Sequence, residues 1–170
     1  MTTFPAMHFL PLGVCLGVGT VWDMAKRRIP NAVSLAAALS GLVVQAVDRG
    51  GLAALSGIGA GALTVALLYR PWLAGGIGGG DVKLAAGVAI WVGLGSMVRY
   101  ALAVSASGGV VAIIAYLLSV QKARGEMRAN LSLAALEHRL PPVPPTAPGR
   151  VSVPYGVAVS AGALITFLTT

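Results

Sequence analysis

The sequence predicts an all-α, polytopic membrane protein with six transmembrane helices and with both termini on the outside. Of its 170 residues, 56% are hydrophobic and only 10% are charged, whereas a soluble domain usually carries about 25% charged residues. The mean hydropathy of +0.84 also excludes a disordered chain, because disordered segments are poor in apolar residues. The charged residues lie at the ends of long apolar intervals, and a helix needs about 20 apolar residues to cross a bilayer core.

Six apolar intervals predict the helices of one membrane domain that covers residues 1–170. Most are long enough to span a bilayer, but the fourth needs Asp81, Val82 and Lys83 as its first turn, or a slight protrusion into a polar cavity. The expected helices lie near residues 4–22, 30–47, 51–69, 81–98, 100–120 and 152–169, and the long connection is residues 121–150.

The first helix has the wrong polarity for a secretory signal peptide. No Lys or Arg precedes its apolar stretch, and its basic residues Lys26, Arg27 and Arg28 follow it. A signal peptide instead begins with positive charges and ends in a small-residue cleavage site. We therefore expect a first transmembrane helix that enters from outside.

The basic residues predict the orientation of the remaining helices, because cytoplasmic loops are enriched in Lys and Arg. With the N-terminus outside, only Arg49 and Arg99 lie in outer loops. The inner loops then hold all the others: Lys26, Arg27, Arg28, Arg70, Lys83, Lys122, Arg124, Arg128, Arg139 and Arg150. The long connection 121–150 is thus expected in the cytoplasm, as a short interfacial helix followed by a proline-rich spacer. It is either a simple connector or a loop that contacts a substrate or partner.

The composition also indicates which partners and ligands to expect. A net charge of +7 is compatible with nucleic acid binding, but in a membrane protein it more often reflects cytoplasmic loops, so we expect the lipid bilayer and no nucleic acid as a partner. The single cysteine, Cys15, cannot form an internal disulfide or a four-ligand zinc site. No metal and no cofactor are predicted.

Two of the five acidic residues stand out by position. Glu126 and Glu137 lie in the basic connection and Asp48 in a short outer turn, where ordinary solvated roles suffice. Asp23 follows Trp22 at the inner end of the first helix, and Asp81 closes a glycine-rich run at the inner end of the fourth. The predicted topology therefore places both carboxylates at the same depth on the same side of the membrane.

A pair of close carboxylates suits aspartic peptide hydrolysis. Both cannot ionise at low cost, so one keeps a proton while the other acts as a base toward water. Simpler roles compete with this interpretation: Asp81 can be the N-cap of a helix, and Asp23 can pair with Lys26 or Arg27 one turn on. The sequence pattern alone leaves these alternatives open.

Three segments resemble motifs of the type IV prepilin peptidase family. Asp23-Met24-Ala25-Lys26-Arg27-Arg28-Ile29-Pro30-Asn31 resembles the motif around the first catalytic aspartate. Gly78-Gly79-Gly80-Asp81-Val82-Lys83-Leu84 is similar to the Gly-x-Gly-Asp-x-Lys-Leu motif around the second. Val153-Pro154-Tyr155-Gly156-Val157-Ala158 resembles a third recurring segment. The compact chain looks like the peptidases of tight-adherence (Flp-type) pilus systems, and the archaeal preflagellin peptidases are a related possibility.

The resemblance implies an aspartic endopeptidase of the inner membrane. Such enzymes remove the basic leader from prepilins at the cytoplasmic face, typically after a glycine and before an apolar helix. Asp23 and Asp81 would be the catalytic pair, and Gly78 and Gly80 would shape the loop. The same motifs carry further candidates for substrate binding or loop shaping: Pro30, Asn31, Lys83, Pro154 and Tyr155. Lys83 would either hold a carboxylate in its ionised form or extend its ammonium group to the interface, the second being favoured.

One departure from the family limits what the resemblance implies. Larger prepilin peptidases carry an extra cytoplasmic region with paired cysteines and also N-methylate the mature pilin. With Cys15 alone, methyltransferase activity is not expected. The alternatives are a small transporter or assembly subunit without catalysis, and a presenilin-like intramembrane protease, whose Pro-Ala-Leu segment the chain lacks.

Overall fold

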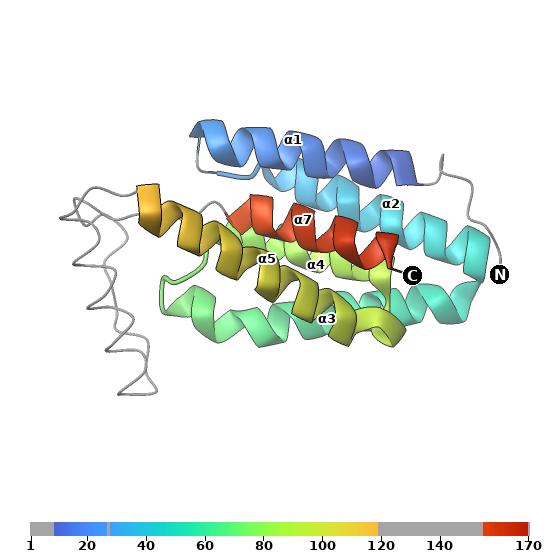
Figure 1. Cartoon of the computed structure of the whole chain (residues 1–170). Helices are drawn as coiled ribbons and strands as arrows, with labels where there is room; N and C mark the ends of the chain where they lie inside the picture. The colour runs from blue at the N-terminus through green and yellow to red at the C-terminus, as the bar shows by residue number, and fades with distance from the viewer. Residues whose placement is uncertain (1–8, 27, 119–154, 170) are drawn as a thin grey trace.

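A computed structural model describes residues 9–26, 28–118 and 155–169 of the chain, and these residues form helices and no strand (Figure 1). In chain order, the helices are α1 (Leu10–Lys26), α2 (Asn31–Arg49), α3 (Gly51–Leu73), α4 (Gly79–Val92), a 3₁₀ turn η2 (Leu94–Ser96), α5 (Met97–Leu118) and α7 (Tyr155–Leu168). The predicted helical class is therefore confirmed for the described residues. The predicted loop 121–150, and the expected first residues of the first and last helices, lie outside them.

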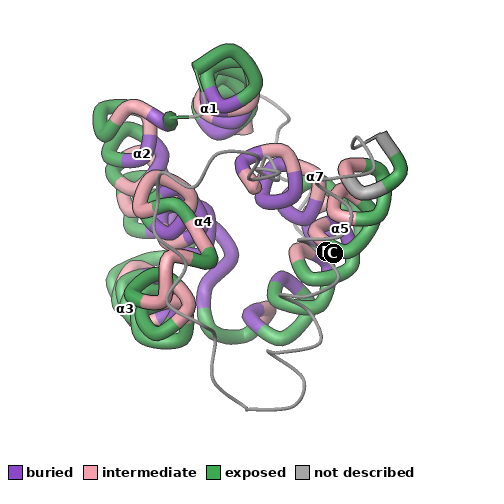
Figure 2. Tube along the Cα trace, turned by 90° about the vertical axis from the view of Figure 1, so that its left-hand side faces the viewer, coloured by how far each residue is buried: buried purple, intermediate pink, exposed green. Residues whose placement is uncertain are grey.

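The helices run side by side, and α4 lies at the centre of the bundle (Figures 1 and 2). It contacts α2, α3 and α7, while α5 packs mainly on α7 and α1 packs on α2 and α7. Most of the α4 residues are buried, whereas large apolar side chains on the outer helices are exposed, among them Leu52, Val47 and Val98. An apolar outer surface around a buried central helix is the arrangement expected for a bundle solvated by lipid.

Three described helices are long and apolar enough to cross a membrane: Asn31–Arg49, Gly51–Leu73 and Leu94–Ala115. The central helix α4 has 14 residues and is therefore about 21 Å long, shorter than the roughly 30 Å of a bilayer core. The prediction of six spans with both termini outside stays a prediction.

The fourth helix was expected to cover 81–98, but it covers Gly79–Val92, and α5 begins at Met97. The break has a local cause, because Gly93 adopts a left-handed backbone with φ of 70°, which favours glycine. The amide of the Gln45 side chain donates hydrogen bonds to the carbonyl oxygens of Ile90 and Trp91, at 3.1 and 2.9 Å. A buried glutamine on α2 thus satisfies carbonyl groups at the end of α4 that have no partner within the helix.

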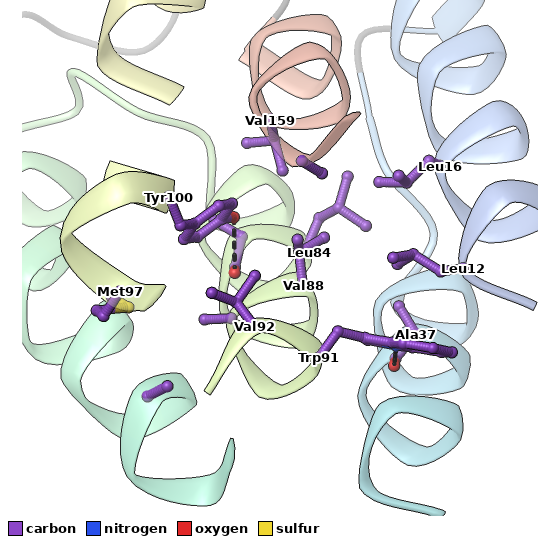
Figure 3. Packing of buried hydrophobic residues seen from close by; sticks show 14 of the residues in the cluster. Leu12, Leu16, Ala37, Leu84, Val88, Trp91, Val92, Met97, Tyr100 and Val159 are labelled. Atoms are coloured by element: carbon purple, nitrogen blue, oxygen red, sulfur yellow. Dashed lines mark hydrogen bonds between the residues drawn. The ribbon is translucent and has the colours of Figure 1, made fainter. Parts of the chain in front are cut away.

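Two aromatic residues anchor α4 and α5 in the core (Figure 3). The indole N–H of Trp91 donates to the carbonyl oxygen of Ala37 on α2 at 2.8 Å, and the Tyr100 hydroxyl donates to that of Ala85 at 3.0 Å. Both side chains are almost fully buried, so their polar groups need these partners. Gly41 makes the Trp91 contact possible, because a Cβ there would lie 2.5 Å from the indole ring.

The bundle has two chemically different ends. One end, which we call the site end, gathers the C-termini of α1 and α3 and the N-termini of α4 and α7 (left in Figure 1). At the opposite end, Arg99 at the start of α5 donates a hydrogen bond to the carbonyl oxygen of Thr169 after α7, at 3.2 Å. The two expected aspartates, Asp23 and Asp81, both belong to helix termini of the site end.

Candidate active site

Asp23 lies in α1, which continues past the expected end at Trp22 to Lys26. Its side chain is only 7% exposed, and its Oδ2 accepts a hydrogen bond of 3.0 Å from the backbone N–H of Gly156. Gly156 is in the first turn of α7, where backbone N–H groups have no partner within the helix and the helix dipole favours negative charge. This hydrogen bond favours the carboxylate form of Asp23.

Asp81 lies in the first turn of α4 and is half-buried. The residue at the N-cap is Gly78, which has no side chain, and Asp81 is the third residue of the helix. The alternative interpretation of Asp81 as an ordinary N-cap is therefore wrong. Its Oδ1 is buried and has no hydrogen-bond partner among the described residues, which leaves one carboxylate oxygen available to a ligand such as water.

The two carboxylates influence each other electrostatically. Asp81 lies outside the three candidate membrane spans. Burial, and then the charge of Asp23, raise the pKa of Asp81 from its usual 3.8 to about 7, while a backbone hydrogen bond from Gly78 acts in the opposite direction. A raised pKa next to a second carboxylate means that the pair retains one proton near neutral pH.

Ile29, in the short connection between α1 and α2, packs against the start of α4, which carries Asp81, and against Gly156, which contacts Asp23. A Cβ on Gly80 would lie 3.2 Å from the Ile29 Cβ and 3.3 Å from its backbone N and O, and a Cβ on Gly156 would lie 3.1 Å from its Cδ1. A Cβ on Gly78 would lie 2.7 Å from the Asp81 Oδ2. Glycine at these positions allows backbone to approach the site more closely than any other residue permits.

The other predicted site residues have more peripheral positions. Lys83 is exposed and donates from its Nζ to the Asn31 Oδ1 at 2.9 Å, so it ties α4 to the first residue of α2. Pro30 is the N-cap residue of α2, with extended backbone. Tyr155 begins α7 and is half-buried, and Pro154 lies outside the described residues.

Gly156 is the residue that sequence reasoning missed. It belongs to the segment Val153–Ala158, in which only Pro154 and Tyr155 were singled out. The one signal available was a glycine at the start of an apolar helix, where a helix former is normally preferred. Its contact with Asp23 joins residues 133 positions apart in the chain, which no local pattern reveals.

Exposed aromatic side chains surround the site end. Trp22 lies under the Lys26 ammonium group, which is 4.8 Å from the ring centroid. Tyr69 and Trp72, near the end of α3, have ring centroids 5.8 Å apart, and all three aromatic side chains are more than 40% exposed. Such residues are enriched where a membrane protein meets the headgroup region.

The described residues contain no group of three or more His, Cys, Asp or Glu side chains that can hold a metal ion. The chemistry that these residues offer is that of a carboxylate pair with different surroundings. Asp23 accepts a hydrogen bond from the Gly156 N–H, and Asp81 accepts one from the Gly78 backbone while its buried Oδ1 has no partner among the described residues.

Comparison with known proteins connects this site to a described family. The family model for the type IV leader peptidase family matches residues 10–114. The matched stretch includes both aspartates, Pro30–Asn31 and Gly78–Lys83, and ends before α7. No curated protein and no solved structure matches the chain.

Proposed function

Because the chain belongs to the type IV leader peptidase family, we propose that it is an aspartic endopeptidase that removes the basic leader from a prepilin-like substrate. The proposal places the enzyme in the inner membrane with its site at the cytoplasmic face. The observation that carries it is the position of Asp23 and Asp81, which are far apart in sequence but both lie at helix termini of the site end, where Ile29 packs against Gly80 and Gly156. The charge of Asp23 also raises the pKa of Asp81.

The arrangement of the two carboxyl groups suits hydrolysis of a peptide bond. The ionised carboxylate takes a proton from a water molecule, whose oxygen attacks the carbonyl carbon of the substrate. The protonated carboxyl donates its proton to the carbonyl oxygen, which gives a tetrahedral species. The C–N bond then breaks as the carboxyl that took the proton from water passes it to the leaving amine, and the other carboxyl takes a proton back from a hydroxyl of the tetrahedral species. The Asp81 Oδ1, buried and without a partner among the described residues, is the position where we place the water or the carbonyl oxygen.

The depth of the site fits a substrate that has one charged and one apolar part. The exposed Trp22, Tyr69 and Trp72 lie near the C-termini of α1 and α3, at the site end, and aromatic residues of this kind mark the level of the lipid headgroups. Lys26 and Arg70 belong to the same end, which is expected of the cytoplasmic side. A leader outside the bilayer and an apolar helix within it then meet the carboxylate pair at their junction.

Cleavage of a prepilin in cells tests the proposal. The chain is co-expressed with a prepilin-like protein that has a basic leader, a glycine and an apolar helix, and leader removal is followed by the shift in electrophoretic mobility. We expect the wild type to trim the substrate, and Asp23→Asn and Asp81→Asn to leave it at full length. Asp48→Asn, an aspartate at the opposite end of the bundle, is the matched control and retains activity. Normal trimming by either of the first two variants, at equal membrane abundance, contradicts the aspartic mechanism.

A further inference from the structure

The N-terminus of α7 makes the two carboxyl groups unequal. The Gly156 N–H lies 3.0 Å from the Asp23 Oδ2, and both residues are buried. A hydrogen bond from a backbone amide to a carboxylate stabilises the charged form, more strongly in a site that excludes water. The helix dipole of α7 adds to this effect within its first turn.

Asp81 also lies in the first turn of a helix and accepts a backbone hydrogen bond from Gly78, but burial outweighs that hydrogen bond. One of its carboxylate oxygens is buried without a hydrogen-bond partner among the described residues, and burial is the main cause of its raised pKa. Burial without full hydrogen-bond compensation favours the protonated form of a carboxyl group, whereas hydrogen bonds from backbone N–H groups favour the ionised form.

Other ionisable groups lie at the same end of the bundle as Asp23. Among the described residues they are Lys26 of α1, Arg28 of the α1–α2 connection, Tyr69 and Arg70 of α3, Asp81 and Lys83 of α4, and Tyr155 of α7. The Lys26 ammonium lies over the Trp22 ring, and Lys83 donates to Asn31. Asp81 is the group whose charge interaction with Asp23 is evident.

We propose that Gly156 is a positioning residue that keeps Asp23 ionised, so that Asp23 takes the proton from water and Asp81 supplies the proton to the carbonyl oxygen of the substrate. This assignment rests on the proposed aspartic peptidase function and adds to it the division of roles. It also gives the C-terminal helix, which lies outside the matched stretch 10–114, a part in the reaction.

A side chain at residue 156 crowds Asp23. A Cβ there would lie 2.9 Å from the Asp23 Oδ2 and 3.2 Å from its Cβ, so the Asp23 side chain must shift to accommodate it. Gly156→Ala therefore moves the carboxylate away from the N–H that stabilises its charge. The expected consequence is a base that ionises only at higher pH.

The pH dependence of leader cleavage by the reconstituted protein tests this proposal. We expect Gly156→Ala to shift the acid limb of kcat/KM upward by about one pH unit, as loss of one hydrogen bond to a charged group implies. We expect a smaller change on the alkaline limb. Gly17→Ala, with no atom within 4 Å of its Cβ, is the neutral control. Gly162→Ala is the packing control on α7, since its Cβ would lie 2.7 Å from the Val104 backbone and does not meet Asp23.

The two proposals fail in different ways. An acid limb that stays in place in Gly156→Ala, while Asp23→Asn and Asp81→Asn are inactive, overturns the role of Gly156 and leaves the peptidase function standing. Normal cleavage by Asp23→Asn overturns the proposed function itself. A shift that also occurs in Gly162→Ala reflects packing and overturns the positioning role.

A measurement on the unmodified protein covers the case in which Gly156→Ala does not fold. The chain contains three aspartates, Asp23, Asp48 and Asp81, so ¹³C NMR of protein labelled at the aspartate carboxyl carbon gives three resonances, assigned by single Asp→Asn variants. We expect Asp23 to remain ionised to lower pH than Asp81. The reverse order of titration overturns the assignment.

Discussion

The close approach of Gly80 to Ile29 predicts that a single methyl group at this position disables the site with little effect on folding. A Cβ on Gly80 would lie 3.2–3.3 Å from three Ile29 atoms, two of them in the backbone. These atoms cannot rotate away, so α4 must shift by a few tenths of an ångström. Overpacking of this kind costs about 1–3 kcal/mol, and the higher helix propensity of alanine returns about 1 kcal/mol. The free energy of unfolding should fall by about 2 kcal/mol or less.

Activity should be much more sensitive, because Asp81 follows Gly80 directly. Displacement of a catalytic group by up to 1 Å can cost about 10²-fold in rate, so we expect Gly80→Ala to lower kcat/KM for leader cleavage by about 10-fold or more. Gly79→Ala is the matched control: its Cβ would come within 3.1 Å of Trp72 Nε1, but Trp72 is 44% exposed and its indole ring can move. Both variants are assayed in nanodiscs with unfolding measured in parallel. Equal activity of the two would refute the role of the Ile29 contact.

Two further predictions concern pH and helix termination. Because the pKa of Asp81 rises from 3.8 to about 7 on folding, the folded protein binds more protons than the unfolded chain across this window, so its stability falls as pH rises from about 4 to 7. This fall should be smaller in Asp81→Asn in unfolding experiments, and wild-type cleavage should decline above about pH 7. Gln45→Leu removes two hydrogen bonds to the end of α4. It should destabilise the protein by about 1–3 kcal/mol, with normal activity per folded molecule; an unchanged unfolding midpoint would contradict this role.

Sequence reasoning located the helices well because their limits are set by local properties. The apolar interval that ends at Arg49 is enough to recognise α2. The interval between Gly50 and Arg70 is enough to recognise α3. The end of α4 was not recognisable in this way, since Trp91 through Val98 is also apolar. It depends on the left-handed Gly93 and on the Gln45 side chain of another helix, which are tertiary features.

The same holds for the site, where local sequence features reveal the aspartates but the fold determines their surroundings. The acids were found because charge is scarce in an apolar chain, so Asp23 and Asp81 are conspicuous at helix ends. Their unequal surroundings were not predictable, because the N–H of Gly156 reaches Asp23 only when α7 packs against α1. For Lys83 the sequence predicts a carboxylate partner or the interface; the side chain is exposed and donates to Asn31. A long side chain can reach several neighbours, and only the fold determines which of them are close.

The central claim is that Asp23 and Asp81 act as one catalytic unit, and cleavage of a synthetic prepilin peptide by purified protein in nanodiscs tests it most directly. Single-turnover rates are compared for the wild type, Asp23→Asn, Asp81→Asn and the double variant, with unfolding measured for each. We expect each single substitution to lower the rate by about 10³-fold or more, and the double substitution to lower it no further, because groups that act as a unit are not additive. A single variant that retains a rate within about 10-fold of the wild type would contradict the account.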